Sequence, residues 1–146
     1  FCKLFNHKKY LGVDVNENFI LNAKKINTRY KFSNFKDNVT KNYKKSINAI
    51  LINNVIHHLS DKQVKESFRF IGKNSKKKSK ILIIEPLYPT NFFSLQFFLK
   101  ALDIGNYIRT KTDYIKILKK EVNMKESYKR KFGMSTAIIF HGYLKS

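Results

Sequence analysis

The chain has 146 residues, enough for one domain with a real core, and a formal net charge of +20. Its single cysteine, Cys2, excludes a disulfide framework and a zinc site built on cysteines, and favours a reducing compartment. No apolar run approaches the roughly 20 residues that a membrane-spanning helix needs, and no signal peptide is visible, so we expect a cytoplasmic protein.

The positive charge comes almost entirely from lysine, which is spread along the whole chain. A basic chain suggests nucleic acid or an anionic membrane surface as a partner. Arginine, the side chain suited to bidentate contacts with phosphates and bases, is scarce here. The densest basic cluster, residues 73–80, is interpreted as a solvated loop before a strand, with a phosphate-binding patch as the alternative.

Hydrophobic patterning predicts alternating elements along the chain. The first part predicts a helix end, a strand, a helix, a weaker strand and a polar loop, in residues 1–9, 10–15, 16–26, 29–34 and 35–45. The second part begins with a predicted strand at residues 47–53, a helix at 60–72, the lysine-rich loop at 73–80 and a strand at 80–86. Two helices, at residues 91–102 and 112–120, and two strands, at 122–132 and 136–144, follow. Asn16 and Ser60 suit the starts of two of these helices.

This alternation predicts an α/β fold, with a Rossmann-like, mostly parallel sheet and helices on both faces. The last two strands have no long crossover between them, so we expect an antiparallel pair at the C-terminus. Neither an internal repeat nor a linker is visible, so residues 1–146 are expected to form a single domain.

Polar or acidic residues close three of the predicted strands, namely Asp14, Asn53 and Glu85. The carboxyl ends of parallel strands meet at one edge of a sheet, where such folds bind ligands. An acidic residue like Asp14 can accept both hydroxyls of a ribose, or it can cap the following helix. Glu85 can contact a substrate, or it can bind backbone N–H groups. The sequence leaves both choices open.

His57 and His58 follow the strand at residues 47–53. An imidazole titrates near neutral pH and can act as a general base toward a nucleophilic hydroxyl. The alternative, which we favour, is that both histidines pack and form hydrogen bonds at the start of the next helix. Adjacent histidines point in different directions and no third ligand is evident, so no metal site is expected.

Three stretches resemble class I S-adenosylmethionine-dependent methyltransferases. Residues 10–25 (YLGVDVNENFILNAKK) resemble the second strand and helix of that family. Residues 48–61 (NAILINNVIHHLSD) resemble its fourth strand and the continuation, and residues 81–86 (ILIIEP) its fifth strand. Residues 103–114 also resemble a segment common in the small-molecule branch. The resemblance covers nearly the whole chain in the right order and spacing.

This resemblance implies S-adenosylmethionine as the cofactor and a small-molecule or lipid-like methyl acceptor. The implied cofactor-binding residues are Asp14, Val15, Phe35, Lys36 and Asn53. Asp14 would hold the ribose, Val15 would lie beside the adenine, and Asn53 would lie near the methionine part. The loop at residues 34–37 would flank the adenine, where the family often has an acidic residue.

In this chain Lys36 or Asp37 falls near the position of that acidic residue. His57 and Glu85 are the candidates on the substrate side, and His58 is the candidate general base.

The chain also departs from the family pattern, because it opens at Phe1 without the first strand and its glycine-rich loop. We therefore expect a fragment whose missing strand belongs between the strands at residues 10–15 and 47–53. Such a fragment should leave strand edges unpaired and bind cofactor poorly.

Two other functions remain as alternatives. A basic α/β module could bind nucleic acid without catalysis, and its affinity would then depend steeply on salt. An RNA methyltransferase is less favoured, because the strand at residues 47–53 continues as NNVIHH rather than the Pro-Pro-aromatic pattern of amino-directed nucleic-acid methyltransferases.

Overall fold

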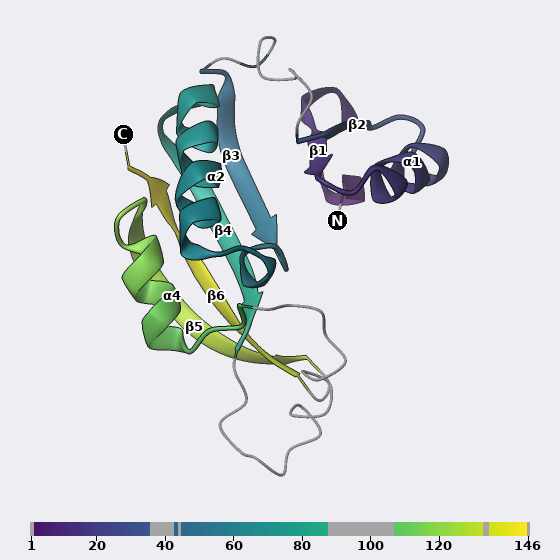
Figure 1. Cartoon of the computed structure of the whole chain (residues 1–146). Coiled ribbons are helices and arrows are strands. Elements are labelled where there is room, and N and C mark those ends of the chain that lie inside the picture. Colours follow the sequence, from purple (N-terminus) through teal and green to yellow (C-terminus); the bar gives the residue numbers. More distant parts are fainter. Residues whose placement is uncertain (1, 36–42, 44, 88–106, 133–134, 146) are drawn as a thin grey trace. The chain divides into compact units, whose positions relative to one another are not determined.

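The computed structural model describes residues 2–35, 43, 45–87, 107–132 and 135–145 (Figure 1). The chain divides into two compact units, Phe1–Tyr43 and Lys44–Ser146, and each is described by itself. The single domain expected from the sequence stays a prediction.

The first unit contains two parallel strands and one helix. Its elements are the 3-10 turns η1 (Cys2–Leu4) and η2 (His7–Lys9), the strand β1 (Leu11–Asp14), the helix α1 (Glu17–Ile26) and the strand β2 (Lys31–Asn34). The Asn16 side chain accepts the N–H groups of Asn18 and Phe19, so the predicted helix start is confirmed.

A helix end was expected over residues 1–9, but the structure has two short 3-10 turns there. Asn6 explains the interruption, because its backbone is extended and its side chain accepts the Lys8 N–H, which starts a new turn.

The second unit is built on a four-stranded sheet in the order β3-β4-β6-β5. Its strands are β3 (Ile47–Asn53), β4 (Ser75–Pro86), β5 (Val122–Phe132) and β6 (Ser135–Leu144). β3 and β4 are parallel, whereas β6 is antiparallel to both of its neighbours. The α/β class and the closing antiparallel pair are therefore confirmed.

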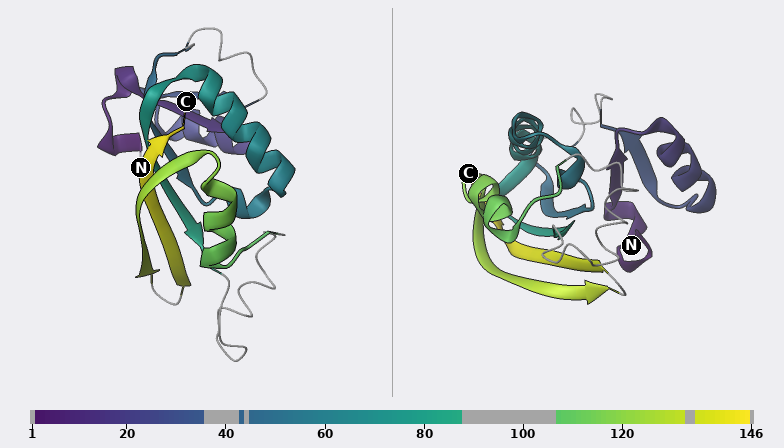
Figure 2. Two further views of the ribbon diagram at one scale, coloured as in Figure 1. Left: turned by 90° about the vertical axis from the view of Figure 1, so that its left-hand side faces the viewer. Right: turned by 60° about the horizontal axis from the view of Figure 1, so that its bottom comes forward.

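Two helices pack on one face of this sheet, as the left view of Figure 2 shows. They are α2 (Asp61–Asn74) and α4 (Lys111–Leu118), and the 3-10 turn η4 (Ile56–His58) precedes α2. Ser60 and Gln63 form a capping box at the start of α2, as its Ser-Asp opening predicts. The helix expected over residues 91–102 lies outside the described residues.

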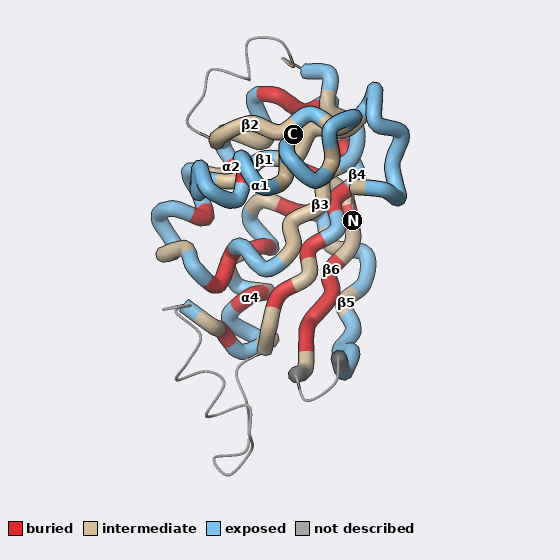
Figure 3. The backbone as a smooth tube through the Cα atoms, turned by 90° about the vertical axis from the view of Figure 1, so that its right-hand side faces the viewer, coloured by how far each residue is buried: buried red, intermediate tan, exposed pale blue. Residues whose placement is uncertain are grey.

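The core of the second unit lies between these helices and the sheet. Figure 3 shows buried stretches along β4 and β6. The buried cluster comprises Ile56, Val64, Phe68, Ile81, Ile83, Tyr114, Leu118, Val122, Ile138, Phe140 and Leu144. Ile81 and Ile83 face the helices while Leu82 between them is exposed, which is the alternation that a pleated strand imposes.

The lysine-rich segment differs from its expected form as a loop, because β4 already begins at Ser75. Ser75 pairs with Ile47, and pairing resumes five residues later at Lys80, opposite Ala49. The run of lysines is therefore a bulge inside a strand. Backbone pairing with β3 overrides the loop-like composition.

Four of the described strands lie at the edge of a sheet, namely β1, β2, β3 and β5. Among the described residues, β1 pairs only with β2 and β3 pairs only with β4. Each therefore presents one row of backbone groups without a strand partner among the described residues.

Candidate functional site

Glu85 closes β4 and organises the turn after β3. The side chain is 0% exposed. Oε1 accepts the N–H groups of Val55 and Ile56 at 2.9 and 2.8 Å. Oε2 lies 3.2 Å from the backbone nitrogen of His57 and 2.8 Å from its Nδ1. Four donors thus surround one buried carboxylate, which meets the requirement that a buried charge be fully hydrogen-bonded.

Arg109 binds the carbonyl groups of the same turn. Its Nη1 donates to Ile56 O at 3.0 Å and to Tyr107 O at 2.9 Å. Its Nη2 donates to Leu59 O and to the Asp61 carboxylate, both at 2.8 Å. The guanidinium group offers five donors in a rigid fork, so one side chain can serve four acceptors.

Glu85 and Arg109 therefore satisfy opposite halves of one backbone segment. The carboxylate takes the N–H groups of Val55, Ile56 and His57, and the guanidinium takes the carbonyl groups of Ile56 and of Leu59, the residue after η4. Asn54 enters the turn with a φ of 55°, a conformation that asparagine tolerates better than most residues. The turn is thus held by residues about 30 and 50 positions away in sequence.

Tyr114 completes the buried polar cluster beneath this turn. Its Oη donates to Pro86 O at 3.1 Å, and its ring lies under the Arg109 guanidinium, with 5.9 Å between the ring centroid and Cζ. Burial raises the pKa of Tyr114, and the negative charge of Glu85 raises it further, although Arg109 opposes both effects. The hydroxyl therefore stays protonated and keeps its role as a donor.

The two histidines of the turn have different surroundings. His57 is buried, and its Nδ1 faces a carboxylate that can only accept, so this nitrogen carries the proton. His58 is exposed, and its ring centroid lies 3.9 Å from that of His57. Only His58 therefore presents its imidazole at the surface. The contacts of Glu85 favour the backbone-binding alternative for that residue.

The turn after β1 is held by short-range contacts. Asp14 Oδ1 accepts the Asn16 N–H at 2.8 Å, and Asp14 O accepts the Phe35 N–H at 2.8 Å. Within the described part of the chain, no other donor reaches the Asp14 carboxylate. Val15 follows with its side chain 63% exposed. One carboxylate oxygen and one apolar side chain are thus available to a ligand at the same turn.

Gly12, two residues before Asp14, lies against the ring of Phe32 and leaves no room for a side chain. A Cβ atom at this position would lie 2.5 Å from Cδ1 of Phe32 on the neighbouring strand. The packing of Phe32 against β1 therefore depends on the absence of a side chain at Gly12.

The predicted site residues fall into two groups. Asp14, Val15 and Phe35 lie together in the first unit, at the ends of β1 and β2. In the second unit the carboxyl ends of β3 and β4 carry a further group, which comprises Asn53, His57, His58 and Glu85. Lys36 and Asp37 lie outside the described residues.

Arg109 and Tyr114 were not identified from the sequence. The available signal for Arg109 is the scarcity of arginine, because each of the four arginines in this lysine-rich chain is a candidate for a position where a planar fork is needed. Tyr114 has no comparable signal.

Metal ligands and membrane-spanning helices are both absent from the described residues. Among the residues that the structure describes, no three His, Cys, Asp or Glu side chains gather as metal ligation would require. None of the helices in the described part of the chain has the length and apolar character needed to cross a bilayer.

The fold resembles that of solved methyltransferases. A SAM-dependent methyltransferase from Methanosarcina mazei aligns with a TM-score of 0.68 and 11% identity, covering 92% of this chain and 81% of that protein. The N-methyltransferase NodS from Bradyrhizobium japonicum aligns at 0.64 and 12% identity, covering 95% and 75%. A protein described as a type 11 methyltransferase from Sulfolobus solfataricus aligns at 0.63 and 13%, covering 93% and 70%.

No protein-family model and no curated protein sequence matches the chain. The likeness is therefore one of structure. The chain has the Rossmann-like fold of class I S-adenosylmethionine-dependent methyltransferases.

Proposed function

We propose that this chain is part of an S-adenosylmethionine-dependent methyltransferase that acts on a small-molecule or lipid-like acceptor. The observation that carries the proposal is the open carboxylate oxygen of Asp14, at the end of β1 in a chain with this fold. NodS, one of the proteins of similar fold, has been solved in complex with S-adenosyl-L-homocysteine. The cofactor is assigned to this chain by that likeness and by the fit of its own residues.

The residues at the ends of β1 and β2 suit a nucleoside. Asp14 uses one oxygen to hold its own turn, and the second can accept from the two ribose hydroxyls. The exposed side chain of Val15 offers an apolar surface to the adenine ring. The Phe35 N–H donates to Asp14 O, which holds Asn34 and Phe35 beside the end of β1. Phe35 is therefore assigned to the adenine, and Lys36, which lies outside the described residues, is assigned there by the resemblance alone.

The second unit supplies the acceptor side of the proposal. S-adenosylmethionine supplies a methyl group on a sulfonium, which is a good leaving group, so the protein mainly orients the reactants. Asn53, at the end of β3, is assigned to the methionine part. His58, with its exposed imidazole, is assigned the acceptor proton. His57 and Glu85 line the same turn and fix the position of His58 through the contacts described above.

The test is a titration of the 146-residue chain with S-adenosylhomocysteine, followed by calorimetry and by amide NMR. We expect affinity weaker than micromolar, because β1 and β3 each have an unpaired edge among the described residues and the printed sequence contains no glycine-rich loop. Amide signals of residues 14–18 should nevertheless shift at millimolar ligand. Micromolar binding by calorimetry would contradict the expected weakness.

Asp14→Asn is the variant that tests the assignment, because it keeps an oxygen for the Asn16 N–H and removes the charge from the ribose side. We expect it to abolish the shifts, whereas Glu17→Gln, at an exposed position in the first turn of α1, should retain them. Equal shifts in both variants, or none in the unmodified chain, would overturn the cofactor assignment.

The nucleic-acid alternative makes a separate prediction. A chain that neutralises several phosphates loses affinity for RNA steeply as salt rises, with a log–log slope of about −0.7 per phosphate on single strands. We expect no slope of that size for this chain, because its lysines are spread along the sequence rather than gathered with arginine. A measured slope corresponding to several charges would favour nucleic-acid binding over a small acceptor.

A further inference from the structure

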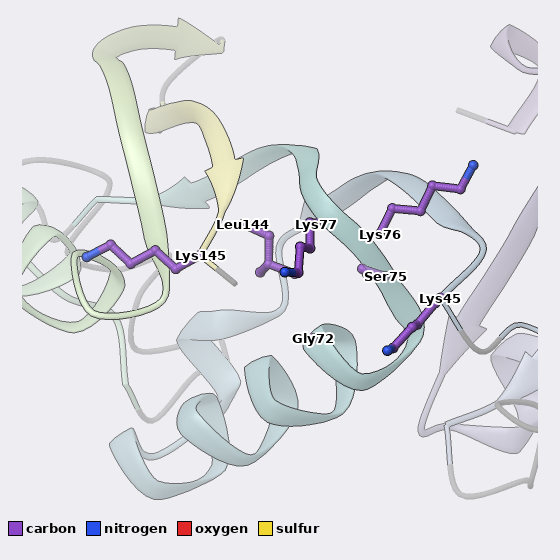
Figure 4. Close-up of a pocket in the computed structure, with 7 residues that line it drawn as sticks. All are labelled: Lys45, Gly72, Ser75, Lys76, Lys77, Leu144 and Lys145. Atoms are coloured by element: carbon purple, nitrogen blue, oxygen red, sulfur yellow. The ribbon is translucent and has the colours of Figure 1, made fainter.

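A lysine-lined cavity lies at the amino end of β4, at the opposite end of that strand from Glu85. It has a volume of about 420 Å³. Its lining residues are Lys45, Gly72, Ser75, Lys76, Lys77, Leu144 and Lys145 (Figure 4). Pockets of roughly 300–1,000 Å³ are the usual size of small-molecule sites. No residue assigned above to the cofactor or to the acceptor lines this cavity.

The wall of the cavity is a built feature of β4. Between Ser75 and Lys80 this strand advances five residues while β3 advances only two, from Ile47 to Ala49, so three extra residues bulge out. Lys78 takes a φ of 57° inside the bulge. Ser79 Oγ lies 2.8 Å from Ile47 O and 2.7 Å from Lys76 O, so its hydroxyl ties the bulge to the neighbouring strand.

The Ser75 hydroxyl, in contrast, has no hydrogen-bond partner in the described part of the chain. The residue is only 5% exposed, and its Oγ is buried without a hydrogen bond among the described residues. An unsatisfied buried polar atom costs roughly 1–3 kcal/mol, so such atoms are rare and call for an explanation. A ligand that accepts a hydrogen bond inside the cavity would supply the missing partner.

The charge of the lining selects an anion. Lysine accounts for four of the seven lining residues, and none of the seven carries a carboxylate. Figure 4 shows Lys45 and Lys77 extending over the cavity, whereas Lys76 and Lys145 point away. The Lys145 ammonium group donates to Lys119 O instead. Two ammonium groups thus extend over a cavity that Ser75 lines.

The C-terminus of α2 opposes an anion in principle, because carbonyl groups concentrate there. Here these carbonyls are already occupied. Asn74 Nδ2 donates to Phe70 O at 2.8 Å, the Ser75 N–H caps Ile71 O, and the Ser46 N–H donates to Asn74 O at 3.1 Å. Their lone pairs therefore point into hydrogen bonds, which weakens their repulsion of a bound anion.

We propose that this cavity binds the phosphate group of a small anion, with the Ser75 hydroxyl as donor and Lys45 and Lys77 as the charged partners. Lysine binds phosphate as a point charge and needs no bidentate geometry. Ser75 lies too deeply for a nucleic-acid backbone to reach it from the surface, so the proposed ligand is free phosphate or a small phosphomonoester. The lysine run at residues 73–80 thereby has a role beyond solubility.

The experiment is an NMR titration of the 146-residue chain with inorganic phosphate and, separately, with glycerol phosphate, at ionic strength held constant with chloride. We expect saturable shifts at Gly72, Ser75 and Lys77, with a Kd on the order of 1 mM. Tighter binding of glycerol phosphate would identify a phosphomonoester as the ligand, and equal binding would identify free phosphate. No saturable shift at about 10 mM of either probe would overturn the proposal.

Two variants test the assigned residues. Ser75→Ala should weaken binding by about fivefold without loss of stability, because the hydroxyl has no partner to lose. The double variant Lys45→Gln with Lys77→Gln should weaken it at least about tenfold. The matched control replaces Lys62 and Lys65, both exposed on α2, by glutamine, and should leave the affinity unchanged.

Two results of this comparison would contradict the site. Equal losses in both double variants would mean that phosphate senses only the diffuse charge of the chain. Displacement of phosphate by a short RNA strand at micromolar concentration would assign the surface to nucleic acid.

Discussion

Asp14 and Glu85 both end a strand with a carboxylate, but the two sites are built in opposite ways. Asp14 is bound within its own turn, by the N–H of Asn16 two residues later. Glu85 is fully buried and receives four donors from residues 28–30 positions earlier in sequence. The first carboxylate keeps an oxygen available to a ligand, whereas the second has none left among the described residues.

Asp14 can therefore act as a binding group, which contacts a ligand, whereas Glu85 acts as a scaffold group, which holds the backbone in place. A carboxylate held by local contacts can remain partly exposed, because its turn does not depend on desolvating the charge. A carboxylate held by distant segments must be buried with complete hydrogen bonding, and its loss leaves unsatisfied donors inside the protein. We therefore expect the two sites to respond differently to substitution.

Glu85→Gln should have the largest effect on stability. The amide nitrogen would face N–H donors, so at least one buried donor loses its acceptor, and the free energy of unfolding should fall by about 3 kcal/mol in urea denaturation. Glu126→Gln is the matched control, since Glu126 is an exposed carboxylate that lies 3.0 Å from His141, and it should cost less than about 1 kcal/mol. Equal losses would mean that burial of Glu85 does not matter.

Arg109→Lys should come next. A single ammonium group cannot reach carbonyl groups on both sides of the turn, so we expect a loss of about 2 kcal/mol in the same assay. Arg130→Lys, at an exposed position on β5, should stay within about 0.5 kcal/mol of the unmodified chain. If Arg109→Lys loses no more unfolding free energy than this control, the hydrogen bonds of Arg109 do not stabilise η4.

The pH dependence of stability should also expose the buried cluster. Because the pKa of Tyr114 is raised on folding, the folded protein retains a proton that the unfolded chain releases above about pH 10, and stability falls as pH rises past that point. The contribution is at most about 1.4 kcal/mol per pH unit. Tyr114→Phe should flatten the alkaline decrease, measured by urea denaturation between pH 9 and 11 (roughly the tyrosine range).

Tyr128→Phe removes an exposed tyrosine from β5 and serves as the control for that experiment. It should keep the alkaline decrease of the unmodified chain. Should both variants lose the decrease to the same extent, Tyr114 is not its source.

Asp14→Asn should have the smallest effect on stability, about 0.5 kcal/mol or less, because the amide oxygen can still accept the Asn16 N–H. Its effect should appear instead in the response of residues 14–18 to S-adenosylhomocysteine. A large loss of stability would show that Asp14 is a scaffold group like Glu85 and would remove the contrast between the two sites.

Local patterns in the sequence were sufficient for much of the fold. The caps at Asn16 and Ser60 depend on contacts within three residues, so they follow directly from residue type and spacing. The strands at residues 47–53 and 122–132 follow from runs or alternation of apolar residues. Where a long-range pairing competes with composition, the prediction failed, as at Ser75, which joins β4 although three lysines follow it.

The sequence alone determined the α/β class, the order of the elements and which residues end the strands, because those properties depend on neighbours along the chain. Only the tertiary structure decided that, among the described residues, Glu85 is saturated while Asp14 keeps an open oxygen, and that Arg109 holds η4. Those outcomes depend on which distant backbone groups meet each charge. Residue type states what a carboxylate can bind, but burial and the available donors decide what it does bind.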